Sequence, residues 1–353
     1  MNPSHTNPRL TSLSHGGGCG CKIAPGVLRD ILKGTTQFPV PPQLLVGIET
    51  ADDAAVYQLN DEQALIATTD FFMPIVDDPY EFGRIAATNA LSDVYAMGGK
   101  PIMALALVGM PINVLSTEVI GKILEGGNAV CRAAGIPIAG GHTIDSVEAI
   151  YGLVALGLVH PKKVKRNADA RVGDRLVLGK PLGVGILSAA LKKEQLSASG
   201  YAQMIDSTTR LNTPGPELSA LNGVHALTDV TGFGLAGHGL ELARGAKASL
   251  RLNWAQVPLL QEVEQLAAQG FITGASGRNW AGYGDEVALA SHITPVQQAL
   301  LSDPQTSGGL LVSCAPETVG EVLKVFERHG FAQAADIGEV VAAGPEGSRL
   351  FVA

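Results

Sequence analysis

The chain has 353 residues, of which 46% are hydrophobic and only 16% are charged, so it can bury a sizeable core and divide into two domains. Its net charge of −8 argues against a nucleic-acid-binding protein, because such proteins normally carry a basic face. No apolar run reaches the roughly 18 residues that span a bilayer, no secretory signal is visible, and four cysteines make no disulfide framework. We therefore expect a cytoplasmic protein with no nucleic-acid and no membrane partner.

The first half of the chain predicts a mobile segment followed by a domain. Residues 1–22 lack hydrophobic periodicity, and we expect a mobile segment rich in Gly and Cys over residues 1–45. Asp78 followed by Pro79 indicates the start of a helix, because an acidic cap and a proline at the first helical position are typical there. The predicted elements of an N-terminal domain, residues 46–160, are strands near 44–46, 54–59 and 64–72, a helix at 79–97, a strand at 101–109, a helix at 117–134, a short strand at 136–139 that ends in a glycine loop, and a strand at 149–159.

A basic stretch with one proline, residues 160–166, is typical of a connection between domains. The pattern then predicts a C-terminal domain over residues 167–353. Its expected elements are a strand at 175–178, a helix after the turn at 179–183, a strand at 226–230, a helix ending near 243, a strand at 310–313, a helix at 321–328, and strands at 335–341 and 349–352. The mixture of strands and helices favours an α/β (or α+β) protein of two domains.

The segment over residues 14–22 places two thiols and an amine at the end of a glycine run. Glycine lets the backbone adopt left-handed and extended conformations without strain, so this segment can carry a thiol to a reacting centre and withdraw it. The ammonium of Lys22 favours the thiolate form of Cys19 or Cys21, which is the nucleophile. Two other interpretations stay open: a flexible tail with incidental cysteines, and a partial zinc site with His15 that lacks a visible fourth ligand.

Five aspartates lie at strand ends, on a helix face or at loop mouths. In the helix at 79–97, Asn89 and Asp93 are four residues apart and therefore share a face. A carboxylate on an otherwise apolar face is costly unless it meets a cation. Any one of these residues could be a cap or turn residue, but together they predict a Mg²⁺ site, since Mg²⁺ is held by a few carboxylates and substrate phosphates. The five are Asp52, Asp53, Asp70, Asp93 and Asp229.

Three glycine-rich stretches, residues 140–143, 231–234 and 306–309, could each offer backbone N–H groups to an anion. Each is a weak signal by itself, because such turns are common. The chain has no P-loop, since Cys21 occupies the position before Lys22 where that motif needs glycine, and no Rossmann fingerprint follows a first strand. Nucleotide binding must therefore use another scheme.

With these residues identified, the chain closely resembles the selenide, water dikinases, also called selenophosphate synthetases. The resemblance covers nearly the whole chain, and its Cys–Lys segment separates this family from relatives that share the fold. The matching motifs are residues 15–22, 52–56, 68–74, 84–90, 140–142, 228–234 and 303–309.

The resemblance implies that ATP, selenide and water give selenophosphate, AMP and phosphate, for selenocysteine and selenouridine formation. It also implies Mg²⁺, an aminoimidazole ribonucleotide synthetase-like fold, and a homodimer whose N-terminal sheets pair into a barrel. By position, Cys19 and Lys22 match the catalytic residues, and the magnesium ligands match Asp53, Asp93 and Asp229. The matching nucleotide contacts are Lys22, Thr50, Ala51, Asp52, Asp70, Asp93, Gly141, His142 and Thr143.

Two competing interpretations remain from the sequence. One is another ATP-dependent kinase or ligase of the same fold that acts on a different small molecule, which gives no reason for Cys19 and Lys22. The other is a thiol-based metal or redox sensor on a nucleotide-binding scaffold. ATP consumption measured with and without selenide separates these from the dikinase.

Overall fold

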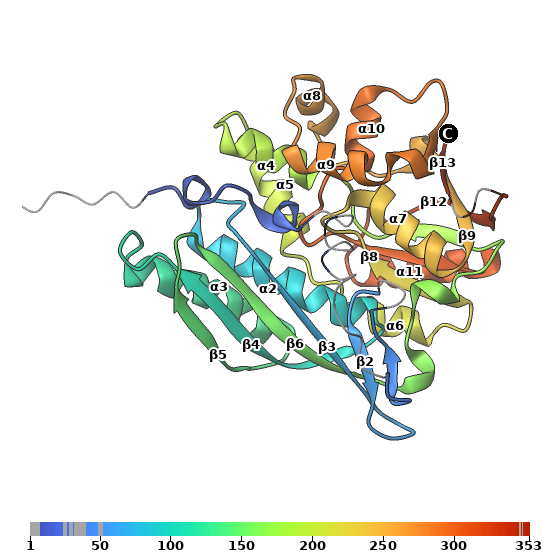
Figure 1. The fold of residues 1–353 in the computed structure, drawn as a ribbon, viewed down its shortest axis with the longest axis horizontal. Coiled ribbons are helices and arrows are strands. Elements are labelled where there is room, and N and C mark those ends of the chain that lie inside the picture. The colour runs from blue at the N-terminus through green and yellow to red at the C-terminus, as the bar shows by residue number, and fades with distance from the viewer. Residues whose placement is uncertain are drawn as a thin grey trace, which may run out of the picture.

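The protein is described by a computed structural model that covers residues 8–23, 27, 31, 40–48, 52–345, 347 and 349–353. Within these residues the strands form two sheets, one in each half of the chain (Figure 1). The N-terminal half lies at the lower left of Figure 1 and the C-terminal half at the upper right. This arrangement confirms the α/β (or α+β) class.

The N-terminal sheet carries two long helices on one face, α2 (Pro79–Ala96) and α3 (Thr117–Ala133). The Asp78 side chain accepts a hydrogen bond from the Glu81 backbone N–H at 3.0 Å, which confirms the predicted helix start. The described strands, in spatial order, are β1 (Leu44–Val46), β2 (Ala55–Gln58), β3 (Ala64–Phe72), β6 (Ile150–Val159), β4 (Lys100–Met110) and β5 (Ile138–Asp145).

Helix α2 is almost wholly buried, because it contacts the N-terminal sheet, helix α3 and elements of the C-terminal half. Glycines allow α2 and α3 to pack closely. A Cβ on Gly83 would lie 1.9 Å from the Ile123 carbonyl oxygen, and one on Gly126 would lie 2.0 Å from that of Tyr80. Two polar side chains of α2 reach the C-terminal half, since Asn89 accepts a hydrogen bond from the Ser307 N–H and Ser92 accepts one from Asn212.

The C-terminal sheet is mixed, and among the described residues it has seven strands. In spatial order these are β10 (Val287–Leu289), β13 (Leu350–Val352), β9 (Ala248–Leu252), β12 (Ala335–Ala342), β7 (Arg175–Leu178), β11 (Leu310–Cys314) and β8 (Val224–Asp229). Its helices are α4 (Val184–Lys192), α5 (Ala198–Thr208), α6 (Gly215–Ala220), α7 (Gly234–Gly245), α8 (Val263–Ala268), α9 (Gly274–Tyr283), α10 (Pro295–Leu301) and α11 (Val319–Arg328).

Short 3-10 helices complete the described elements: η1 (Leu10–Leu13), η2 (Gly18–Cys21), η3 (Pro161–Lys163), η4 (Asn167–Asp169), η5 (Trp254–Gln256), η6 (Gly284–Glu286) and η7 (Pro316–Thr318). Elements η3 and η4 follow one another where the sequence predicts a connection between domains. In the described part of the chain, none of the helices combines the length and the apolar character that crossing a bilayer requires.

One predicted element is wrong. The sequence suggested a short strand at 136–139 that ends in a glycine loop, whereas β5 continues through Gly140, Gly141 and His142 to Asp145. Parallel pairing with β4 holds these residues in the strand, since Leu107 is the register partner of His142. Pairing with a neighbouring strand therefore outweighs the turn preference of two glycines.

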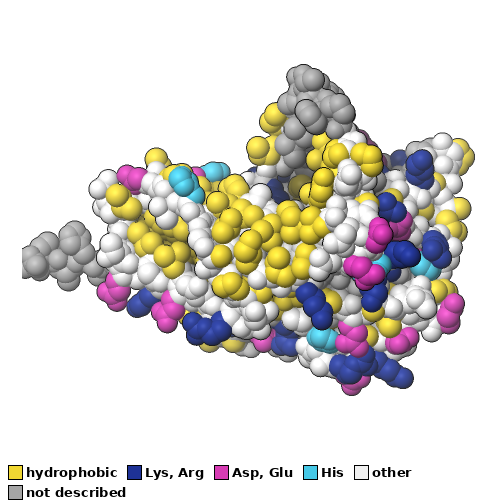
Figure 2. Space-filling view, turned by 90° about the horizontal axis from the view of Figure 1, so that it is seen from below, with side chains coloured by type: hydrophobic (Ala, Val, Ile, Leu, Met, Phe, Trp, Pro, Cys, Tyr) yellow, Lys and Arg dark blue, Asp and Glu magenta, His cyan; other side chains and the backbone are white. Residues whose placement is uncertain are grey.

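The face of the N-terminal sheet that α2 and α3 leave open carries apolar side chains (Figure 2). Register pairs Tyr57 with Leu65, and Leu65 with Leu158, so these residues share one face. Phe71 lies on the same face of β3 and is 51% exposed. An apolar face of this extent usually marks an interaction surface.

Candidate active site

The Gly/Cys segment, residues 14–22, packs between the two halves of the molecule. The Gly18 N–H donates to the Met73 carbonyl at 2.8 Å, and the Cys19 N–H donates to Thr306 Oγ1 at 3.1 Å. Gly18 has a φ of +53°, and a Cβ there would lie 2.2 Å from Thr306 Oγ1, so only glycine fits. Of the segment predicted to be mobile, residues 1–7 and most of 24–39 lie outside the described residues, and its mobility stays a prediction.

Asn89 on α2 joins this segment to both halves. Its Oδ1 accepts hydrogen bonds from the Cys19 thiol at 3.1 Å and from the Ser307 N–H at 2.8 Å. Its Nδ2 donates to Asp70 Oδ2 at 2.5 Å. Because Asn89 is 1% exposed, this network fixes the position of the Cys19 thiol in a dry environment.

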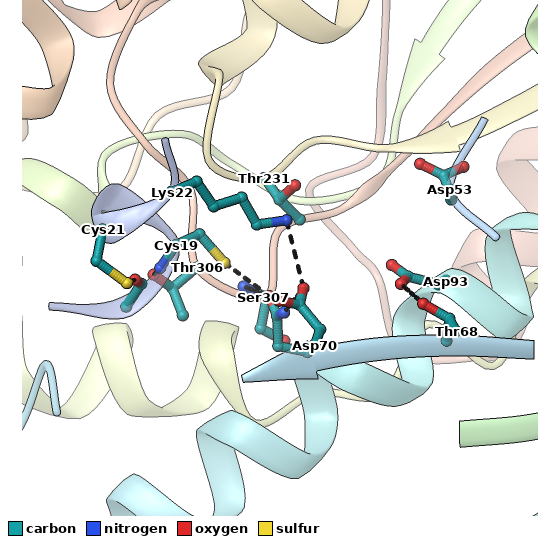
Figure 3. Close-up of polar contacts among 12 residues, drawn as sticks. Cys19, Cys21, Lys22, Asp53, Thr68, Asp70, Asp93, Thr231, Thr306 and Ser307 are labelled. Atoms are coloured by element: carbon teal, nitrogen blue, oxygen red, sulfur yellow. Dashed lines mark hydrogen bonds and ion pairs between the residues drawn. The ribbon is translucent and has the colours of Figure 1, made fainter. Parts of the chain in front are cut away.

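Lys22 reaches from the segment toward Asp70 at the end of β3 (Figure 3). Lys22 Nζ lies 3.5 Å from Asp70 Oδ2, and this carboxylate raises the pKa of Lys22 above its ordinary value. The ammonium therefore stays charged at neutral pH. The predicted catalytic pair Cys19 and Lys22 is thus placed beside one of the predicted nucleotide contacts.

The ionisation of Cys19 differs from the expectation. Burial, followed by the nearby Asp70 carboxylate, raises the pKa of the Cys19 thiol well above its ordinary value. Lys22 acts in the opposite direction but does not outweigh these two causes. In this arrangement the Cys19 side chain is a protonated thiol that donates to Asn89, not a thiolate.

Three of the predicted carboxylates meet at the boundary between the halves. Asp93 accepts a hydrogen bond from Thr68 Oγ1 (Figure 3). Asp53 Oδ1 accepts one from Thr228 Oγ1 at 2.9 Å. The buried oxygens Asp53 Oδ2 and Asp229 Oδ2 have no hydrogen-bond partner among the described residues. A buried carboxylate oxygen without a partner is costly, so a cation would stabilise both carboxylates.

The pKa shifts of these carboxyl groups also indicate a cation site. Burial, together with the nearby Asp229, holds the pKa of both Asp53 and Asp93 well above the ordinary value. Burial likewise raises the pKa of Asp229. Asp93 and Asp229 are buried and Asp53 is half-buried, and three acids that disfavour one another's charge form a site that a cation would stabilise. We call Asp53, Asp93 and Asp229 the acidic cluster.

The acidic cluster is not a closed metal cage. Among the described residues, no group of three or more His, Cys, Asp or Glu side chains is arranged to hold a metal ion by itself. The donor set nevertheless fits Mg²⁺, which prefers oxygen ligands and completes its coordination with water and substrate phosphates. The two unpaired carboxylate oxygens are the observation on which this fit rests.

The zinc interpretation finds no support in the described residues. His15 Nδ1 contacts Glu148 Oε1 at 2.9 Å, and the Cys21 thiol donates to the Gly18 carbonyl at 2.9 Å. The Cys19 thiol turns to Asn89 instead. The three side chains that could have shared an ion therefore have three different partners.

The other predicted nucleotide contacts do not lie together in the structure. Asp52 precedes Asp53 of the acidic cluster, and its Oδ1 accepts a hydrogen bond from the Asn167 N–H at 2.7 Å. Thr50 and Ala51 lie outside the described residues. Gly141, His142 and Thr143 lie on β5 at the sheet edge. Strands β6 and β4 separate β5 from β3, a distance of about 14 Å at the usual strand spacing. Within one chain, Gly141, His142 and Thr143 therefore do not reach Asp70.

Sequence reasoning missed several residues that hold the site. Thr306 and Ser307 lie in a stretch that was predicted to bind an anion through backbone N–H groups, yet the Thr306 hydroxyl and the Ser307 N–H contact Cys19 and Asn89 instead. Thr68 could have been found, because it lies two residues before Asp70 on one strand and therefore on the same face. Asn279 on α9, which donates to the Gly232 carbonyl at 2.9 Å, carried no sequence signal.

Comparison with known proteins defines the class. Residues 51–159 match the family model for the AIR synthase related protein, N-terminal domain, and residues 171–350 match that for the C-terminal domain. Thiamine-monophosphate kinase from Stenotrophomonas maltophilia K279a aligns with a TM-score of 0.65 at 18% identity, covering 88% of this chain and 91% of that one. The hydrogenase maturation protein HypE in complex with ATP aligns at 0.64 and 19%, covering 98% and 95%. The chain is thus a two-domain protein of the AIR synthase related class, as predicted.

Closer relatives define the family within that class. The chain is 72% identical over 334 residues to the selenide, water dikinase of Burkholderia ambifaria (strain MC40-6), covering 95% of this chain and 94% of that protein. It is 59% identical over 335 residues to the selenide, water dikinase of Rhizobium meliloti (strain 1021), covering 95% and 96%. The chain belongs to the selenide, water dikinase family, which confirms the resemblance seen in its motifs.

Proposed function

We propose that the boundary between the two halves is the active site at which ATP, selenide and water are converted into selenophosphate, AMP and phosphate. The observation that carries this proposal is the position of Cys19 and Lys22 over Asp70, next to buried carboxylate oxygens that have no hydrogen-bond partner among the described residues. The identity of 59–72% with proteins named selenide, water dikinase supports it.

The acidic cluster would hold Mg²⁺ together with the phosphates of ATP. When bound, Mg²⁺ neutralises the charge that builds up on a transferred phosphoryl group. Thr228 and Thr68 each donate to one carboxylate of the cluster and so orient it before the nucleotide arrives. ATP is the substrate, and Mg²⁺ is the cofactor of this proposal.

Lys22 supplies the fixed positive charge of the site. Its ammonium pairs with Asp70 when no nucleotide is bound, and a phosphate oxygen can replace that carboxylate as its partner. The Gly/Cys segment above it excludes water from the first phosphoryl transfer. Water is the acceptor in the second phosphoryl transfer, so the segment must open before that step. The segment therefore acts as a lid.

We propose a homodimer in which two N-terminal sheets pair into a barrel. The open apolar face of the sheet and the exposed edge strand β5 support it, because such a surface is costly in water. Since one chain holds Gly141, His142 and Thr143 away from Asp70, these residues contact the nucleotide only if pairing brings them from the partner subunit.

The dimer predicts a sedimentation mass near twice 36.5 kDa at micromolar concentration. Replacing Ile144, which is 56% exposed on β5, by aspartate should shift the protein toward monomer and lower activity with it. The control is Val172→Asp, which adds the same charge at an exposed site of the C-terminal half and should leave the mass unchanged. A fully active monomeric wild-type protein would contradict the proposal.

The reaction itself predicts a stoichiometry of one AMP and one phosphate for each selenophosphate. Phosphorus NMR of an anaerobic reaction can count all three products, with a sample that lacks selenide as the control. Accumulation of ADP as the end product would instead favour a simple kinase of the same fold.

We also place the protein in the cytoplasm. Its four cysteines, Cys19, Cys21, Cys131 and Cys314, are all free thiols. A reducing compartment keeps Cys19 available, since disulfides are rare in the cytosol.

A further inference from the structure

A cavity of about 240 Å³ lies on the outer side of the Gly/Cys segment. It is lined by residues of that segment and of both halves of the molecule, among them Gly17, Gly20, Lys192, Arg278 and Thr306. Its volume is below the roughly 300 Å³ at which pockets for drug-sized ligands begin, so it suits a small ion rather than a nucleotide. We call it the outer pocket.

The charge of the outer pocket is positive. Lys192 and Arg278 line it, and no aspartate or glutamate does. Within the described ranges, neither cation pairs with a carboxylate: Lys192 Nζ donates to the Ser14 carbonyl at 3.3 Å, and Arg278 Nη2 donates to the Gly20 carbonyl at 3.1 Å. Two uncompensated cations at one opening, in a protein of net charge −8, attract small anions to that point.

A second, much smaller cavity of about 10 Å³ shares lining residues with the outer pocket. Cys19 and Lys22 line this inner cavity. Gly20, Ala275 and Arg278 line both cavities, so they form the wall between them. The inner cavity holds about one water-sized molecule. Of the three residues in the wall, only Arg278 has a long side chain with rotatable bonds, so it is the one that can open the wall.

The outer pocket and the acidic cluster lie on different sides of Cys19 and Lys22. In Figure 3, Cys19 and Cys21 lie on one side of the Lys22–Asp70 pair, and Asp53 and Asp93 lie on the other. A nucleotide bound at the acidic cluster therefore leaves the outer pocket free. The second reactant can approach the thiol without passing the phosphates.

We propose that the outer pocket admits and holds selenide as the singly charged hydrogen selenide anion, and that Arg278 and Lys192 draw it in. Arg278 then releases the Gly20 carbonyl and lets the anion pass to Cys19 and Lys22. This inference rests on the proposed function, and it adds the route by which the selenium substrate reaches that site.

The test is the double variant Arg278→Gln/Lys192→Gln, assayed anaerobically by selenophosphate formation. The KM for selenide should rise about tenfold, whereas kcat and the KM for ATP stay at wild-type values. Raising the ionic strength should lower kcat/KM for selenide in the wild type and have little effect in the double variant. Arg278→Lys alone should keep most of the affinity, since it keeps the charge.

Lys193→Gln is the matched control, because Lys193 lies over the Phe271 ring at 5.4 Å and does not line the outer pocket. It removes a neighbouring charge and should leave the KM for selenide unchanged. An unchanged selenide KM in the double variant overturns the inference. So does an equal rise in both KM values, or a fall in kcat alone, because Arg278 would then only support the segment. A wild type that makes no selenophosphate would overturn the proposed function instead.

Discussion

Replacement of Cys19 by serine is expected to lower selenide-dependent turnover by about two orders of magnitude or more, while ATP binding persists. Serine keeps the size and can still donate to Asn89 Oδ1, so the packing of this 1%-exposed side chain is preserved. It is far less readily ionised and far less nucleophilic than cysteine. Selenophosphate formation and calorimetric titration with ATP measure the two effects separately.

Cys21→Ser is the matched control for this prediction. The Cys21 thiol donates to the Gly18 carbonyl and not to Asn89, and a serine hydroxyl can make the same contact. We expect the variant to keep much of the wild-type activity. Equal losses in both variants would mean that the two thiols act as a pair. If neither variant lost activity, the segment would act through Lys22 alone and the thiol would have no chemical role.

Replacement of Asp229 by asparagine is expected to abolish turnover and weaken binding of Mg²⁺ with nucleotide, yet stabilise the metal-free protein. Asp229 is 1% exposed, and it raises the pKa of both Asp53 and Asp93. Removing its charge relieves the other two, which should raise the Tm of the metal-free protein by about 1–2 °C for each kcal/mol gained. Thermal unfolding with and without Mg²⁺ and an ATP analogue measures this.

The same variant has a defined pH dependence. Burial raises the pKa of Asp229 above 3.8, so the folded metal-free protein binds that proton more tightly than the unfolded chain. Stability therefore falls as the pH rises from about 4 through the raised pKa, and the slope should be smaller in Asp229→Asn. Asp61→Asn, at an exposed turn, is the control. Full activity at ordinary Mg²⁺, or a less stable metal-free variant, would contradict the account.

The parts of the structure that depend on neighbouring residues could be predicted from the sequence. The cap at Asp78 and Pro79 defined the start of α2, and the spacing of Asn89 and Asp93 placed both on one buried face. These patterns are local, because capping and helical periodicity act over a few residues. The aspartates of the acidic cluster were found in the same way, one strand end or helix face at a time.

The parts of the structure that depend on residues distant in the sequence could not be predicted. Asn89 accepts from Ser307 across 218 positions, and no local pattern shows that contact. The same holds for the ionisation of Cys19: the neighbouring Lys22 lowers the pKa of the thiol, but burial raises it by more. Strand β5 shows the limit for secondary structure, because pairing with β4 extends it through two glycines that locally favour a turn. Arg278 and Asn279 lie on α9, a helix that no pattern in the sequence predicted.

We propose that the acidic cluster binds the metal ions and phosphates of ATP beside Lys22, on the side away from Cys19 (Figure 3). The most direct test of this claim is a crystal structure of the wild-type protein with a non-hydrolysable ATP analogue and Mn²⁺ in place of Mg²⁺, whose anomalous signal locates the metal. We predict metal peaks in contact with Asp53, Asp93 and Asp229, and the analogue's phosphates between them and the Lys22 ammonium. Metal and phosphates bound elsewhere, with the acidic cluster free of both, would contradict the claim.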